Sequence, residues 1–115
     1  MSIQLTDITN IPVSTTALVH APAANTAAVI TITGVTGKTL ILTRVICSYD
    51  GDPTGGNLTV KNKTAVVFNI DLVASGVYEF SIVRKCTQAE NLVVTLAAGG
   101  TGVSGKLNIE YILVD

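Results

Sequence analysis

Short segments of alternating apolar and polar residues recur along this chain, and almost no stretch has the periodicity of a helix. Gly, Asn, Asp and Pro separate these segments at short intervals, as they do between strands. The expected strands are residues 14–20, 27–33, 38–49, 57–61, 64–72, 77–83, 91–97 and 106–114. The polar residues 84–90 are expected to form a loop. The pattern predicts an all-β protein.

About eight strands in 115 residues favour an antiparallel β-sandwich of the jelly-roll type. An immunoglobulin-like sandwich is the alternative, although a chain without Trp lacks the Cys…Trp…Cys pattern of that fold. The length is typical of one domain. We assign residues 13–115 to the sandwich. Residues 1–12 are assigned to an N-terminal arm that could add a strand to the sheet edge of a neighbouring molecule.

The longest expected strand, 38–49, is apolar on both faces, which is typical of a central strand or of one covered by a partner subunit. Alternation places Leu40, Leu42 and Ile46 on one face and Ile41, Val45 and Cys47 on the other. In the hairpin formed by 57–61 and 64–72, alternation also predicts which side chains enter the core. These are Leu58, Val60, Val66, Phe68, Ile70 and Leu72.

Charged residues are scarce, at 13% of the chain against 48% hydrophobic residues, and the mean hydropathy is +0.55. Ordinary domains carry about 25% charged residues. Apolar surface that a monomer cannot cover is often covered by a partner. The composition therefore predicts a homo-oligomer.

Nucleic acid and membrane are not expected partners. The basic residues form no run beyond Lys61/Lys63 and Arg84/Lys85, and no Trp is present to stack on bases. The uncharged stretch from Ile8 to Gly37 is interrupted by proline and polar residues, so it does not predict a membrane helix. The first residues do not have the pattern of a signal peptide, and we expect folding in a reducing cytosol.

One glycine-rich segment, Gly100–Lys106, matches most of a phosphate-binding P-loop. The next position needs Ser or Thr for magnesium but holds Leu107, and a strand pattern follows where a helix is required. Gly37-Lys38-Thr39 resembles the end of a second P-loop, but Ile32 stands where its first glycine would be. Both segments are interpreted as turns, and no cofactor is expected.

The loop from Asp50 to Gly55 resembles the start of a calcium-binding loop, with Asp50 and Asp52 as oxygen ligands. The twelfth position needs Glu but holds Lys61. We interpret the loop as a turn between strands and assign no metal residues. A weak calcium site at Asp50 and Asp52 stays open at this point.

No residues are assigned to catalysis. His20 is the only histidine, and no carboxylate in its uncharged stretch could orient it as a base, so we expect a hydrogen-bonded structural role. Cys47 and Cys86 have neither metal-ligand spacing nor a nearby histidine. Two free buried thiols are expected, with a Cys47–Cys86 disulfide as the alternative. The chain is not expected to be an enzyme.

Three segments resemble small structural proteins of bacteriophage particles. They are the hairpin 52–60 (DPTGGNLTV), the strand Gly76–Phe80, and the ending 92–109 with its glycine-rich turn. The residue pattern of 27–44 is also similar to that of these proteins. The resemblance covers about residues 25–112 and carries no catalytic residues.

This resemblance implies a β-sandwich that folds in the cytoplasm of the host bacterium and is located in the virion, as a head decoration (cement) protein or as a minor head or tail component. It further implies symmetric oligomers, with a homotrimer favoured, and capsid or tail proteins as partners. The alternative function is a carbohydrate- or ligand-binding β-sandwich. Such modules stack sugars on exposed aromatic rings, so this function would be favoured if two of Tyr49, Tyr78 and Tyr111 line a common groove.

Overall fold

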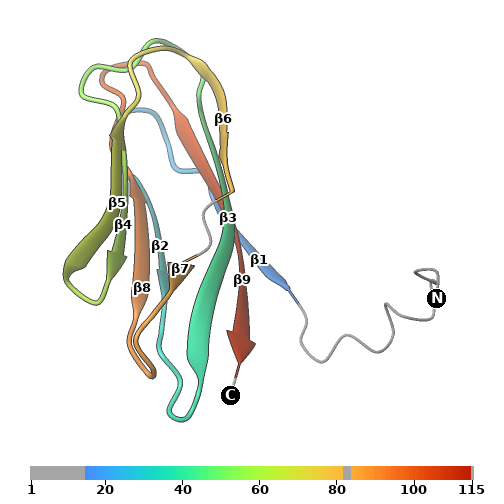
Figure 1. Cartoon of the computed structure of the whole chain (residues 1–115). Helices are drawn as coiled ribbons and strands as arrows, with labels where there is room; N and C mark the ends of the chain where they lie inside the picture. The colour runs from blue at the N-terminus through green and yellow to red at the C-terminus, as the bar shows by residue number, and fades with distance from the viewer. Residues whose placement is uncertain (1–14, 82–83, 115) are drawn as a thin grey trace, which may run out of the picture.

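The structure is a computed structural model that describes residues 15–81 and 84–114. Two antiparallel sheets pack face to face (Figure 1). The strands are β1 (Thr16–His20), β2 (Ala28–Ile32), β3 (Thr39–Tyr49), β4 (Asn57–Asn62), β5 (Ala65–Asp71), β6 (Gly76–Phe80), β7 (Arg84–Lys85), β8 (Leu92–Leu96) and β9 (Gly105–Val114). Sheet A has the order β1-β9-β3-β6, with β7 beside β3, and sheet B has the order β2-β8-β4-β5. The expected arm, residues 1–12, lies outside the described residues.

The strand order is that of a jelly roll. The two-residue β7 aside, the chain pairs β1 with β9, β2 with β8, β3 with β6, and β4 with β5, as in a long folded ribbon. Rolling the ribbon brings β3 beside β9 and β4 beside β8. The predicted fold class is confirmed. The immunoglobulin-like alternative is wrong, because that fold has a different strand order.

The expected loop 84–90 is wrong at its start, because Arg84 and Lys85 pair with Leu42 and Ile41 of β3 as a short strand. Both side chains are exposed, so their charge does not prevent backbone pairing at the sheet edge. No helix in the described ranges is long and apolar enough to cross a membrane.

A register shift in β3 changes which of its side chains reach the core. The shift lies between Leu42 and Arg44 and leaves Thr43 as an extra residue, whose hydroxyl donates to the Glu110 carbonyl at 3.0 Å. A bulge reverses the alternation beyond it. The predicted faces of the strand are therefore wrong: the inward side chains are Leu40, Leu42, Val45, Cys47 and Tyr49, all buried, and Ile41 and Ile46 face outward.

A second register shift, between Val60 and Lys61, leaves Val67 as an extra residue in β5. Val66 consequently lies opposite Lys61 and is 54% exposed, which corrects its predicted place in the core. Ile70 lies opposite buried Leu58, yet it is 37% exposed because β5 is an edge strand. The other core predictions for this hairpin hold: Leu58, Val60 and Leu72 are buried, and half-buried Phe68 packs on Phe80 at a ring-centroid distance of 5.4 Å.

Candidate functional site

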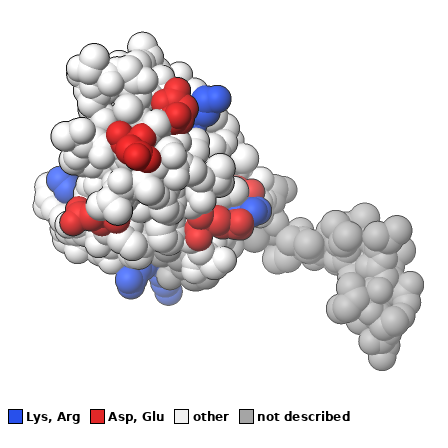
Figure 2. All heavy atoms as spheres, turned by 90° about the horizontal axis from the view of Figure 1, so that it is seen from above, with Lys and Arg blue, Asp and Glu red and all other residues white. Residues whose placement is uncertain are grey.

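Charged side chains are sparse on the sandwich and absent from β1 and β2. Figure 2 shows acidic and basic side chains that are scattered and separated by uncharged surface. Both β1 and β2 fall in the part of the sequence without any charged residue, and both are edge strands on the same side of the sandwich. We call residues 15–32 the charge-free side. Its exposed apolar side chains include Val19 at 65% and Val29 at 41% exposure.

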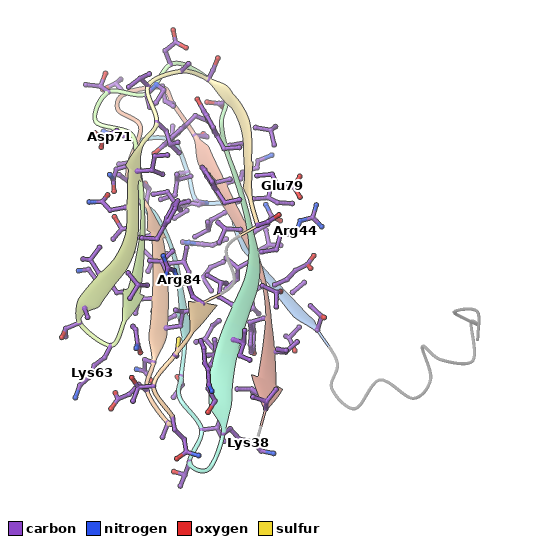
Figure 3. All side chains as sticks on the ribbon, viewed as in Figure 1. Lys38, Arg44, Lys63, Asp71, Glu79 and Arg84 are labelled. Carbon is purple, nitrogen blue, oxygen red and sulfur yellow. The ribbon has the colours of Figure 1, made fainter. Side chains whose placement is uncertain are left out.

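One group of charged side chains lies on the outer face of sheet A. Arg44 of β3 contacts Glu79 of β6, with Nη2 and Oε2 2.6 Å apart, and Glu110 of β9, with Nη1 and Oε2 3.8 Å apart. Figure 3 shows Arg44 and Glu79 together on the outward side of β3 and β6. These side chains are 39–51% exposed, so the pairs contribute at most about 1 kcal/mol each to folding. The buried Nε of Arg44 has no hydrogen-bond acceptor among the described residues.

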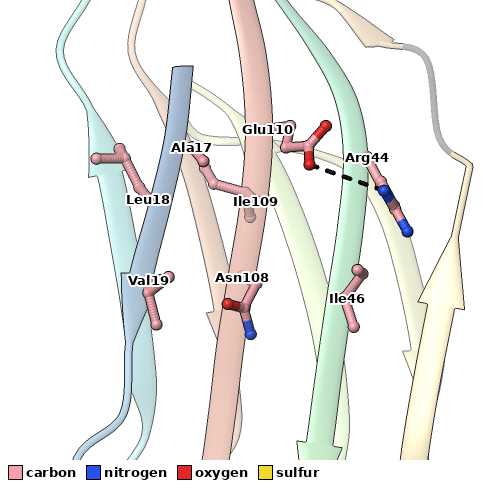
Figure 4. Close-up of a pocket in the computed structure, with 8 residues that line it drawn as sticks. All are labelled: Ala17, Leu18, Val19, Arg44, Ile46, Asn108, Ile109 and Glu110. Atoms are coloured by element: carbon pink, nitrogen blue, oxygen red, sulfur yellow. Dashed lines mark ion pairs between the residues drawn. The ribbon is translucent and has the colours of Figure 1, made fainter. Parts of the chain in front are cut away.

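Beside Arg44, the outer face of sheet A forms a hollow of about 330 Å³ (Figure 4). Its outward side chains alternate with the buried Val45, Leu107 and Ile109. One row across the sheet runs Val19, Asn108, Ile46, and the next runs Ala17, Glu110, Arg44. The hollow thus joins an apolar patch on β1 and β3 to one basic and one acidic group, and its β1 residues belong to the charge-free side.

The outer face of sheet B is different in character, since its polar groups bond to one another. The Thr59 hydroxyl donates to Oδ1 of Asn57 at 2.6 Å, and Nδ2 of Asn57 donates to Oδ1 of Asn69 at 2.6 Å and of Asp71 at 3.0 Å. Thr95 lies directly beside Thr59 in the next strand. Asn57 thus links the polar side chains of β4 and β5 on this face to one another, whereas the hollow on sheet A offers apolar surface.

The two aspartates of the calcium-like loop each hold a different neighbouring loop. Oδ1 of Asp50 accepts the N–H of Ser104 at 2.7 Å, and Oδ1 of Asp52 accepts the N–H of Ser75 at 2.9 Å. Within residues 15–81 and 84–114, no group of three or more His, Cys, Asp or Glu is placed to hold a metal ion. The geometry gives these carboxylates a structural role.

The P-loop-like segment is a turn that packs on Tyr49. Its 100–103 turn is closed by the Val103 N–H donating to the Gly100 carbonyl at 3.1 Å, and strand β9 follows. A Cβ on Gly99 would lie 2.5 Å from Cγ1 of Val103 and 3.1 Å from the Tyr49 ring, and a Cβ on Gly105 would lie 2.8 Å from Cδ2 of Leu96 and 3.2 Å from that ring. Glycine at these two positions therefore permits the close packing, and the expected strand after the segment is confirmed.

His20 has the hydrogen-bonded role that was expected. Its Nδ1 accepts the backbone N–H of Val29 on β2 at 2.9 Å, which links the two edge strands of the charge-free side.

Cys47 and Cys86 are free and buried, as predicted. Burial raises the pKa of the Cys47 thiol from 9.0 to about 11 and also raises the pKa of Cys86.

Aromatic side chains all face inward. Tyr78, Tyr111 and Phe80 lie opposite the core residues Cys47, Leu42 and Val45, and Phe68 lies opposite Val60. Tyr49 is 2% exposed and donates its hydroxyl to the Ala97 carbonyl at 2.6 Å. The hollow is lined by none of them. The chain therefore does not present its tyrosines as a common exposed platform.

Comparison by sequence finds no matching family model and no matching curated protein. Similar solved structures include the capsid of Helicobacter pylori bacteriophage KHP30, 13% identical over 89% of this chain and 99% of that chain, with a TM-score of 0.44. They also include the CBM36-1 domain of a xylanase from the hindgut metagenome of Trinervitermes trinervoides, 11% identical over 87% and 97% of the two chains, TM-score 0.41. Latent PorU from Porphyromonas gingivalis is 9% identical over 89% of this chain but only 13% of its own, TM-score 0.45. The likenesses concern the β-sandwich alone.

Sequence reasoning missed the group formed by Arg44, Glu79 and Glu110. The three residues lie on separate strands, and only the pairing of β3 with both β6 and β9 brings them together. The outward position of Arg44 and Ile46 also depends on the bulge at Thr43. The one available signal was a charged residue among the apolar residues of each of three strands.

Proposed function

We propose that this protein is a non-enzymatic structural protein that acts by binding other protein subunits through the outer face of sheet A. The observation that carries the proposal is the hollow beside Arg44, which joins exposed apolar side chains to the charge-free side. Cores of protein interfaces are depleted in charge and enriched in Arg. The Arg44 side chain is 42% exposed, so its guanidinium can contact a partner.

The proposed place of assembly is a bacteriophage particle. This part of the proposal rests on the resemblance of 52–60, 76–80 and 92–109 to small virion proteins, with a head decoration role preferred over a minor head or tail role. Capsid or tail proteins are then the partners, and self-association accompanies that binding. The jelly roll is a common architecture of viral capsid domains, so the fold is compatible with this role.

A carbohydrate-binding role has less support from the geometry. Sugar-binding sandwiches present aromatic rings to the sugar, whereas the tyrosines of this chain lie on the inner face of sheet A. The described groups near the hollow are aliphatic, amide and ionic side chains. We therefore propose the structural role in preference to the carbohydrate-binding one.

Co-sedimentation with particles tests the proposal. The full chain is mixed with purified heads and, separately, tails of the phage that encodes it, and bound protein is measured after centrifugation. We expect binding to one of the two, and a loss of at least ten-fold in affinity for Ile46→Lys. The new charge would lie opposite Glu79, so we also expect the fold to be retained. Thr95→Lys on the outer face of sheet B is the matched control. No binding to either particle, together with binding on a glycan array, would replace the proposal with the carbohydrate-binding role.

A further inference from the structure

Edge strands of the sandwich differ in how they are protected against pairing with another molecule. An edge strand exposes unpaired N–H and C=O groups, and proteins protect such edges with charges, proline, bulges or covering groups. In the described part of the chain, the edges are β1 and β6 with β7 in sheet A, and β2 and β5 in sheet B.

Three of these edges carry a protective feature. The β6–β7 edge bears the charged residues Glu79, Arg84 and Lys85. The β5 edge is interrupted by its bulge at Val67 and ends at a charged residue. On β2, the N–H of Val29 that points away from β8 is already bonded to His20. None of these strands offers a regular, free, uncharged ladder.

The β1 edge has no such feature. Its sequence, TALVH, has neither charge nor proline, and its ladder with β9 runs from Thr16 to His20 without a bulge. Its Val19 is 65% exposed at the rim of the hollow. Beyond β1, strand β9 continues through Ile112–Val114, which pair with β3 on one side and with no described residue on the other. Among the described residues, the free edge therefore continues beyond β1.

We propose that β1 pairs antiparallel with β1 of a second copy, so that the two sheets A become one continuous sheet. This inference rests on the proposed function and specifies how self-association occurs. The strand is self-complementary: with Leu18 on the two-fold axis, small Ala17 lies opposite Val19 of the second copy, and no charges repel. Edge pairing of this kind obtains affinity from main-chain hydrogen bonds.

The surface next to β1 enlarges this contact. A stable interface buries about 1,200 Å² or more in total, which is more than five paired residues supply. Because β2 lies on the same side of the sandwich, pairing at β1 also brings the two copies of β2 towards each other. Val29, 41% exposed, then adds apolar area. The absence of charge from the whole of 15–32 removes the repulsion that such an approach would otherwise meet.

A contact between identical surfaces closes on itself as a pair. The inference therefore predicts a dimer or a larger even-numbered assembly, in contrast to the trimer that the phage resemblance implies.

Sedimentation equilibrium of full-length variants tests the pairing. We expect a dimer or even-numbered oligomer for the unmodified chain, a weakening of its self-association by at least ten-fold in Val19→Glu, and no change in Val66→Glu. Val66 is a matched control, because it is similarly exposed and its Glu would lie opposite Lys61. Mixing Val19→Glu with Val19→Lys should restore association, since diagonal cross-strand positions are within reach of long side chains.

Several results would overturn the pairing. One is a monomer or trimer for the unmodified chain; another is unchanged association in Val19→Glu. A third is disruption by Leu5→Glu but not by Val19→Glu, which would make the N-terminal segment the occupant of the edge. A trimer that still binds particles would reject the β1 pairing and leave the proposed function intact. A dimer that binds no particle would support the β1 pairing and reject the proposed function.

Discussion

The turn at Gly34 provides a sharp test of how β2 and β3 are joined to the segment before β8. The Gly34 N–H donates to Oδ1 of Asn91 at 2.7 Å, and a Cβ on Gly34 would overlap the backbone carbonyl of Ala89 and lie 2.8 Å from the Glu90 carbonyl carbon. Backbone atoms cannot rotate away as a flexible side chain can. Gly34→Ala must therefore separate the two segments.

We expect this substitution to destabilise the protein by about 3 kcal/mol, from overpacking and from the loss of the Asn91 hydrogen bond. For a chain of 115 residues, that is a fall of about 12 °C in Tm. Thermal unfolding followed by circular dichroism measures it. Gly51→Ala is the control, because its Cβ would meet only a Val103 methyl at 3.3 Å. A Gly34→Ala protein within about 1 kcal/mol of the unmodified chain would refute the packing described here.

Three further substitutions test individual contacts. The raised pKa of Cys47, about 11, gives stability that is present below pH 9 and is lost as the pH rises through 11. Between pH 7 and 10.5, the free energy of unfolding measured with guanidinium should fall by about 2 kcal/mol because of this thiol. In Cys47→Ala this part of the fall should be absent. An equal pH dependence of the two proteins would contradict the prediction. Tyr49→Phe should cost about 1 kcal/mol in the same assay by removing the part-buried hydrogen bond to the Ala97 carbonyl, and no change would argue against that bond. His20→Ala should speed hydrogen exchange at the Val29 amide, and unchanged exchange would show that another group protects this N–H.

Most of the fold could be predicted from the sequence because strand alternation is regular wherever one face is buried. The segments that became β2, β4, β8 and β9 have this pattern, and their inward residues Leu58, Val94, Leu96 and Leu107 are buried. Gly, Asn, Asp and Pro indicated the turns between them. A jelly roll was favoured by strand number alone, and strand pairing then established it.

The bulges could not be predicted. An extra residue such as Thr43 or Val67 leaves the local sequence pattern unchanged and only reverses which later residues face the core. Ile46 was therefore assigned to the wrong face and Val66 to the core. The short strand β7 was missed because its pairing depends on the position of β3 and not on apolar residues of its own.

Less of the candidate site could be predicted. The low charge of the chain indicated protein contacts, and the stretch without charge was visible in the sequence. Its location on two edge strands of one side became apparent only from the pairing of β1 with β9 and β2 with β8. The hollow needed the same long-range information, because it draws residues from β1, β3 and β9.

The central claim is that this protein works through the outer face of sheet A and the charge-free side. Hydrogen exchange of the full chain, free at low concentration and then assembled on particles, measures it most directly. The account predicts that amides of Thr16–His20 and of Ile112–Val114 exchange at least ten-fold more slowly in the assembly, while those of β5 are unchanged. Unchanged exchange in β1 and β9, with new protection confined to β5 or to the loop 50–56, would contradict it.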